Sequence, residues 1–214
     1  MNRPREQLID SLAAGLTPIT KPGETTPTIV MWLCGAALLS VVAVLLIGPL
    51  REHAFAPLLV NPRYLAEAVL GTCSIVALAI AGLRLAVPSM APLRTRVTAP
   101  LLLLALWVGL YAYGLHDSTL PVSMAGKRAH CMFEAALVGV PALAWGLWLA
   151  RRWWPLHGAW SGLLLGFAAG AMPALLMQFA CMYAPAHILL FHLLPGLSLG
   201  VIGALAGAWY LRQR

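Results

Sequence analysis

The chain has 214 residues, of which 61% are hydrophobic and only 10% are charged, and its formal net charge is +7. This composition leaves no long polar region for a separate soluble domain. The positive balance requires no nucleic-acid partner, because basic residues that flank membrane spans account for it. The first 27 residues are polar and lack the apolar stretch of a secretory signal, so they predict a short exposed tail.

The tail contains the first predicted element, an amphipathic helix of about three turns. Its apolar residues Leu8, Ile9, Leu12 and Leu16 fall at positions i, i+1, i+4 and i+8. A free helix this short is marginal in water, so its apolar stripe should lie in a partner's groove or on the membrane surface. The polar face bears Asp10 and no lysine, which favours a protein partner over anionic lipid.

Six apolar runs follow, each of roughly 18–25 residues and long enough to cross a bilayer core. They predict an all-α, polytopic membrane protein with a six-helix transmembrane domain over residues 28–212, embedded in the lipid bilayer. Their approximate limits are Thr28–Leu50, Tyr64–Val87, Val97–Leu115, Cys131–Ala150, Leu156–Cys181 and His187–Tyr210.

The distribution of Lys and Arg predicts the orientation of the chain. Ten of these residues lie on the side of the tail and four on the other side. This excess predicts that the protein lies in a bacterial inner membrane with both termini on the cytoplasmic side. The ends that carry Cys131 and Cys181 then face the periplasm. Two acids near these outer ends, Glu67 and Glu134, should face the bundle interior or a wet crevice, because intramembrane acids are costly.

Two cysteines form the most informative pair of the chain. Cys131 and Cys181 lie 25 residues on either side of the turn near Leu156, so two helices rising about 1.5 Å per residue return them to one depth. A disulfide, a metal-binding dithiol and two unrelated packing residues all remain open for this pair. Cys34 and Cys73 lie inside the first two spans and are predicted to be apolar packing residues.

Further donors surround the two thiols. His130 and Glu134 share one helical face, so the carboxylate could orient the imidazole, and an interfacial ion pair is the alternative. Met182, His187 and His192 follow the second cysteine, but the interval of five residues between the two histidines is expected to keep them from chelating one ion together. Cu(I) is the first metal to consider for Cys, Met and His donors, with Cd(II), Zn(II) and dithiol oxidation also open.

Glycines recur at every fourth position in the fifth span, and two pairs in the sixth span repeat the same interval. Small residues at this interval let helix backbones approach closely, so both spans are predicted to pack tightly. One possible arrangement is that the two spans pack against each other. These residues are Gly158, Gly162, Gly166 and Gly170 in the fifth span and Gly196, Gly200, Gly203 and Gly207 in the sixth.

Three classes of function are compatible with this sequence: a membrane regulatory or binding protein, a metal or small-solute transporter, and a membrane thiol oxidoreductase. A transporter should show polar residues converging at mid-span, and none is apparent. A redox enzyme would need a vicinal dithiol, and the chain has no Cys-x-x-Cys motif. A regulatory protein without enzymatic activity is therefore favoured, and its oligomeric state is left open.

Several motifs in order give the chain a family resemblance. The chain has the tail motif 8–13, six spans, His130 and Cys131 at the entry to the fourth span, and Cys181 ahead of 191–196 and a glycine-spaced last helix. In this order, these features resemble the NrsF-type family of membrane anti-sigma factors. The resemblance covers almost the whole chain. One position departs from the pattern, since Ala180 precedes the second cysteine where relatives often carry His.

The resemblance implies a specific function. The cytoplasmic face would sequester an extracytoplasmic-function sigma factor, with the tail helix as the binding element. An outside stress linked to heavy metals or oxidation would release the sigma factor. Within this pattern Cys131 and Cys181 are the residues that respond to the signal.

Overall fold

The structure is a computed structural model that describes residues 3–14 and 25–212. Within these ranges it contains helices and no strand, so the predicted all-α class is confirmed. Six helices are long and apolar enough to cross a membrane, and their limits lie within four residues of the predicted ones.

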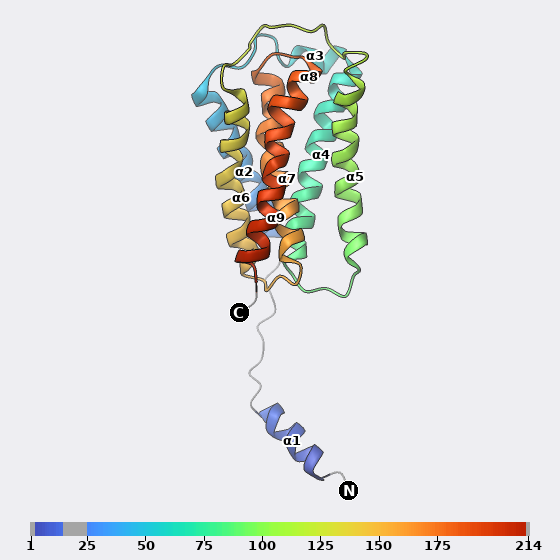
Figure 1. The fold of residues 1–214 in the computed structure, drawn as a ribbon, viewed down its shortest axis with the longest axis vertical. Coiled ribbons are helices and arrows are strands. Elements are labelled where there is room, and N and C mark those ends of the chain that lie inside the picture. Colours follow the sequence, from blue (N-terminus) through green and yellow to red (C-terminus); the bar gives the residue numbers. More distant parts are fainter. Residues whose placement is uncertain (1–2, 15–24, 213–214) are drawn as a thin grey trace.

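The spans form a bundle in which the start of α2 and the end of α9 lie at the same end (Figure 1). Five spans are single helices, and the sixth is built from three consecutive pieces. The single helices are α2 (Thr25–Ile47), α4 (Pro62–Leu85), α5 (Leu93–Tyr113), α6 (Cys131–Arg151) and α7 (Gly158–Ala180), and the sixth span joins α8 (Pro185–His187), the π-helix η1 (Ile188–Leu193) and α9 (Leu194–Tyr210). The remaining elements are α1 (Arg3–Ala14) and the short α3 (Ala56–Val60). We call the end that carries α3 and α8 the site end of the bundle.

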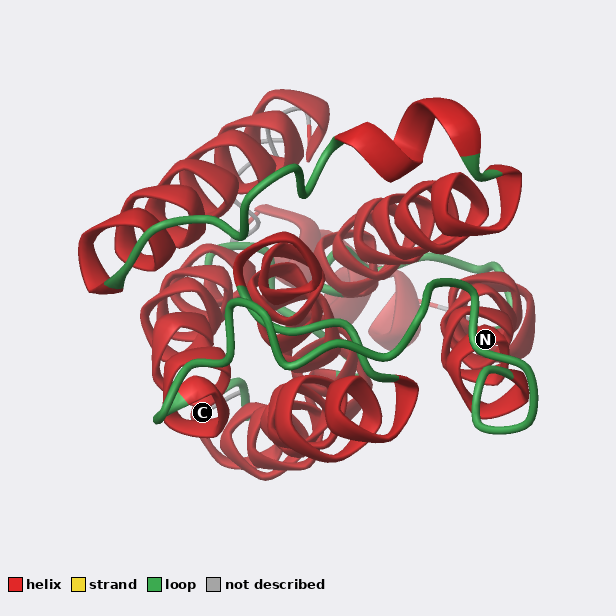
Figure 2. Cartoon of the chain, turned by 90° about the horizontal axis from the view of Figure 1, so that it is seen from above, coloured by secondary structure: helices red, strands yellow, loops and turns green. Residues whose placement is uncertain are grey.

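Helix α7 is the central element. It contacts α2, α4, α6 and α9, and 72% of its most apolar window is buried, more than in any other described span. Figure 1 shows α7 and α9 in the middle of the bundle, with α2 and α6 on one side and α4 and α5 on the other. Seen along the bundle, one helix lies in the centre and other helices surround it (Figure 2). The contacts of α7 with four other helices identify it as this central helix. The end of α7 therefore lies among several helices and can receive side chains from them.

The contact between α7 and α9 is a seam of glycines. A Cβ added to Gly162 would overlap the carbonyl oxygen of Gly203, and one added to Gly170 would overlap that of Gly196. The backbones touch directly along this seam, as helices can where neither carries a side chain. The structure thus places the glycine stripes of the fifth and sixth spans against each other. The same seam includes Gly158, Gly166, Gly200 and Gly207.

Helix α1 contains three of the four residues of the predicted apolar stripe and is separate from the bundle. Among the described residues it contacts no other helix. Its stripe residues Leu8, Ile9 and Leu12 are 59%, 54% and 63% exposed. Leu16, the last member of the predicted stripe, lies outside the described residues. An apolar stripe with this exposure is available to a partner.

The seam predicts that a single methyl group on α7 is destabilising. Gly162→Ala and Gly170→Ala should each lower the free energy of unfolding by about 2 kcal/mol or more, because the new Cβ must separate two backbones. The matched control is Gly109→Ala on α5, where a Cβ meets nothing within 4 Å and helix propensity improves by up to about 1 kcal/mol. Thermal unfolding of the purified protein in detergent measures the difference. Equal Tm values for all three variants would show that the seam is not closely packed.

Candidate metal and thiol site

Four side chains meet at the site end of the bundle and bring two thiols and two imidazoles together. Cys131 is the first residue of α6, Cys181 caps the end of α7, His187 ends α8 and His192 lies in η1. One donor atom from each of the four lies within 4.8 Å of the others. We call this set the donor cluster. The sequence placed Cys131 and Cys181 at one depth, and the structure brings their sulfur atoms to one point.

Two distances within the donor cluster match those of tetrahedral coordination. Nε2 of His187 lies 3.3 Å from Sγ of Cys131 and 3.5 Å from Sγ of Cys181. In a tetrahedral zinc site the metal lies about 2.3 Å from sulfur and about 2.0 Å from nitrogen, so neighbouring ligand atoms are roughly 3.5 Å apart. The donor cluster can therefore accept one ion without a large movement of the chain.

The donors are shielded from solvent. Cys131 is 4% exposed, and Cys181 and His192 are fully buried. Neither ring nitrogen of His192 has a hydrogen-bond partner within the described part of the chain. A buried polar group without a partner loses the free energy of its hydration, so such groups need a specific reason. Coordination of an ion by His192 would supply the missing partner.

The expectation that His187 and His192 cannot share one ion is wrong. Their ring centroids are 4.9 Å apart in an edge-to-face arrangement. The cause is η1, in which hydrogen bonds run from i to i+5, as in the bond from the N–H of Leu194 to the carbonyl of Leu189. Five residues correspond to about one such turn, so both imidazoles lie on the same side of the helix.

Pro195 is the sequence signal for this irregular turn. It has no N–H to donate to the carbonyl four residues earlier, and in a regular α-helix its ring would clash with that carbonyl. A wider turn just before the proline removes this conflict. A π-helical turn inside a span is also common at functional sites.

His130 and Glu134 lie next to the donor cluster without joining it. His130 is exposed, and the buried Glu134 accepts a hydrogen bond from Arg128 at 2.8 Å. Among the described residues Glu134 thus pairs with Arg128, and no hydrogen bond joins its carboxylate to the ring of His130. Arg128 also donates to the carbonyls of Val44 and Gly48 at 3.2 and 2.7 Å. A cation is favourable at this helix C-terminus, so Arg128 joins the end of α2 to α6.

Met182 and the other two cysteines lie in different environments. Met182 is buried in the same apolar cluster as Cys131, Cys181 and Met177. Cys34 and Cys73 are exposed on the outside of the bundle, so the expectation that they pack inside it is wrong. All four cysteines are free thiols.

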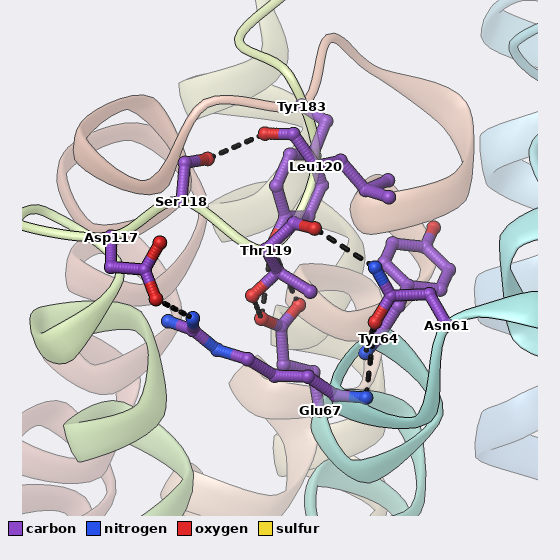
Figure 3. A network of polar contacts seen from close by, with 9 residues as sticks. Asn61, Tyr64, Glu67, Asp117, Ser118, Thr119, Leu120 and Tyr183 are labelled. Atoms are coloured by element: carbon purple, nitrogen blue, oxygen red, sulfur yellow. Dashed lines mark hydrogen bonds and ion pairs between the residues drawn. The ribbon is translucent and has the colours of Figure 1, made fainter.

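A second polar group lies at the site end, around the buried Glu67 (Figure 3). Its carboxylate accepts hydrogen bonds from Thr119 at 2.5 Å, from Tyr183 at 2.9 Å and from Gln178 at 3.3 Å. Burial raises the pKa of Tyr183, so this hydroxyl keeps its proton and acts as the donor. The interior position of Glu67 agrees with expectation, but sequence reasoning missed its partners. They come from two other parts of the chain, and no local pattern links them to α4.

Fold and site together define a multi-pass helical membrane protein with a buried thiol and imidazole cluster at one end. A family model described as negative regulator of sigma F (NrsF) matches residues 12–213, and the chain therefore belongs to this family. The resemblance found in the sequence is thus confirmed.

One curated relative is the anti-sigma-F factor NrsF of Caulobacter vibrioides (strain NA1000 / CB15N), which is 35% identical over 86 residues. The aligned part spans 38% of this chain and 39% of that relative, well under two thirds of its length. No solved structure shows significant similarity to the chain.

The geometry predicts that the two buried thiols can be linked by a short bifunctional thiol reagent. In a Cys34→Ser/Cys73→Ser background, one reagent molecule should bridge Cys131 and Cys181, because all donor atoms lie within 4.8 Å of one another. Intact mass spectrometry of the protein measures the bridge. Variants that also carry Cys131→Ser or Cys181→Ser should show only single attachment. Two separate attachments on the background protein would contradict the proximity of the two thiols.

Proposed function

We propose that this protein holds an extracytoplasmic-function sigma factor at the cytoplasmic face of a bacterial inner membrane and releases it when a soft metal ion binds from the periplasm. Family membership supports negative regulation of a sigma factor. The observation that carries the sensing step is the donor cluster, with four donor atoms within 4.8 Å of one another. Soft and borderline donors of this kind select soft metal ions.

The proposed orientation follows from charge. Ten of the 14 basic residues belong to the tail, to the connections at its end of the bundle or to the C-terminal end of the sequence, and cytoplasmic segments carry such an excess. Both termini are then cytoplasmic, and the donor cluster faces the periplasm. The signal and the sigma factor would act at opposite ends of the bundle.

The proposed contact with the sigma factor is the tail, residues 1–27, while residues 28–212 form the membrane domain. The exposed stripe of Leu8, Ile9 and Leu12 on α1 supports this assignment. Leu16 completes the proposed stripe, and Asp10, on the polar face, is the remaining tail residue proposed to contact the sigma factor. An amphipathic helix that lays such a stripe into a groove is a common mode of recognition.

Charge balance supports a divalent ion as the signal. Two thiolates and two neutral imidazoles around Zn(II) or Cd(II) give no net charge, whereas Cu(I) leaves one negative charge. An unpaired charge is costly in a buried site, and Cys131, Cys181 and His192 are all buried. Cu(I) has the stronger preference for sulfur donors, so it is the informative comparison.

The donor cluster also offers a route for the signal. A bound ion would hold the start of α6, the end of α7 and the α8–η1 segment at fixed spacing. The close α7–α9 seam would pass this constraint along the bundle, because packed interiors are poorly compressible. Binding of the ion would then favour one of two helix packings.

The sensing proposal predicts the behaviour of cysteine and histidine variants. Cys131→Ser, Cys181→Ser and His192→Ala should each reduce metal-dependent induction at least tenfold while the sigma factor stays bound without metal. The double cysteine variant should be no worse than either single one, because the ligands act as a unit. The measurement is a reporter driven by the partner sigma factor, with Zn(II), Cd(II), Cu(I) or an oxidant added.

Cys34→Ser and Cys73→Ser are the matched controls and should respond as the wild type does. Full metal induction in Cys131→Ser/Cys181→Ser would refute the proposed sensor. Induction by the oxidant alone, lost in the same variant, would assign the signal to thiol oxidation instead of metal binding.

The tail proposal predicts that Leu8→Asp/Leu12→Asp releases the sigma factor while the protein stays in the membrane. Each substitution places a charge on the stripe that would have to be desolvated in the groove. The matched control is Gln7→Asp/Ser11→Asp, which adds the same two charges at the same spacing on the other side of α1. A pull-down from native membranes measures retention. Equal retention of the sigma factor by both variants would exclude the stripe as the contact.

A further inference from the structure

The segment 181–187, which consists of the connection after α7 and the short helix α8, carries two members of the donor cluster, Cys181 at its start and His187 at its end. Its backbone is extended at Cys181 and at Ala184, so the helical hydrogen-bond pattern is interrupted between them. Residues 181–185 are nevertheless buried. Contacts from other parts of the chain therefore help to determine where the segment lies, and one of them is the hydrogen bond from the N–H of Ser123 to the carbonyl of Tyr183 at 3.3 Å.

Glu67 on α4 binds this segment from both sides of Cys181. Tyr183, two residues after the cysteine, donates its hydroxyl to both carboxylate oxygens at 2.9 Å. Gln178, three residues before it, donates its amide at 3.3 Å. Thr119, from the connection between α5 and α6, donates a third group at 2.5 Å. All three neighbours present donors, and this arrangement suits an ionised carboxylate.

An arginine strengthens the same connection. Arg51 donates to the carbonyl of Cys181 and to the hydroxyl of Tyr64, both at 3.3 Å. Tyr64 lies one turn before Glu67 on α4, and its ring centroid is 5.6 Å from that of Tyr183. The segment that carries Cys181 is thus attached to one face of α4 by several independent contacts.

The other end of α4 is attached to α7 as well. Ser161, in the first turn of α7, donates its buried hydroxyl to the carbonyl of Gly82 at 2.8 Å. Helix α4 therefore contacts α7 at both ends, with Glu67 at the donor cluster and Gly82 near the opposite face. A displacement of the segment that carries Cys181 would be transmitted to the opposite end of the bundle through α4 as well as through the seam.

We infer that Glu67 is a positioning residue for the donor cluster: its carboxylate holds the segment that carries Cys181 and His187 and connects this segment to α4. The inference rests on the proposed function, because it treats the donor cluster as a metal site. Glu67 itself contacts no member of the cluster and acts through Tyr183 and Gln178. Residues that orient metal ligands typically change affinity by about 10–100-fold when they are replaced.

The test compares Glu67→Gln and Tyr183→Phe with the wild type, all as full-length protein in detergent. Both variants keep the size of the side chain and weaken the same hydrogen bond. Each should bind Cd(II) at least tenfold more weakly in a chelator competition, and the double variant should be no weaker than the weaker single one. The matched control is Asp117→Asn, which breaks the neighbouring ion pair of Arg63 with an exposed carboxylate and should bind as the wild type does.

Co(II) bound in place of Cd(II) supplies a second readout, because its visible absorption reports the geometry of the ligands. The spectrum should change in Glu67→Gln and Tyr183→Phe and stay unchanged in Asp117→Asn. Variants with a lower Tm but with wild-type Cd(II) affinity and an unchanged Co(II) spectrum would show that Glu67 is merely structural, and would overturn the inference. If Glu67→Gln fails to accumulate, Tyr183→Phe, which removes a single hydroxyl, carries the test alone.

The wild-type measurements separate this inference from the proposed function. Wild-type protein that binds neither Cd(II) nor Co(II) would refute the metal site, and the positioning role with it. Binding by the wild type that is lost in Cys131→Ser/Cys181→Ser but unchanged in Glu67→Gln and Tyr183→Phe would refute only the role of Glu67.

Discussion

The direct backbone contact between α7 and α9 is the constraint on which the rest of the structure depends. Where Gly162 and Gly170 face Gly203 and Gly196, carbonyl oxygens occupy the space that side chains would otherwise fill. This contact sets α9 against α7 along its length, and η1 continues α9 toward the end of α7. His192 therefore arrives beside Cys181 as a consequence of packing far from either residue. A wider helix spacing would separate the imidazole from the thiol.

A local irregularity completes what this packing begins. The π-helical turn of η1 brings His187 and His192 to one point, with ring centroids 4.9 Å apart. Such a turn lacks the regular α-helical hydrogen bonds. Pro195 could not form its own bond of this kind in any case, because it has no N–H. The buried ring of His192 has no hydrogen-bond partner for either nitrogen within the described residues, and this loss of hydration is unfavourable. The proposed ion site would give this ring the partner that it lacks.

Sequence reasoning predicted the elements and missed the details that depend on contacts between them. Span number, span limits and the glycine stripes follow from apolar length and spacing alone. The pairing of His187 with His192 was missed because a regular helical period was assumed across Pro195. The outward positions of Cys34 and Cys73 were missed because lipid is as apolar as the bundle interior, so hydropathy does not distinguish the two faces. The partners of Glu67 lie 52 and 116 residues away and leave no local pattern.

The concentration of polar groups at one end gives a physical reason for a signal to begin there. The donor cluster and the Glu67 group both lie near helix ends, where segments are short and their positions depend on a few directed bonds. The rest of the bundle is held by apolar packing and by the seam, which resist compression but allow helices to shift as units. An ion that joins α6, α7 and η1 at their ends would change which of these shifts is most stable. Helix α1, which contacts no other described helix, could respond only through the far face of the bundle. The proposed signal therefore has to travel as a movement of whole spans, and α7, which contacts four of the other five, is the span through which it would pass.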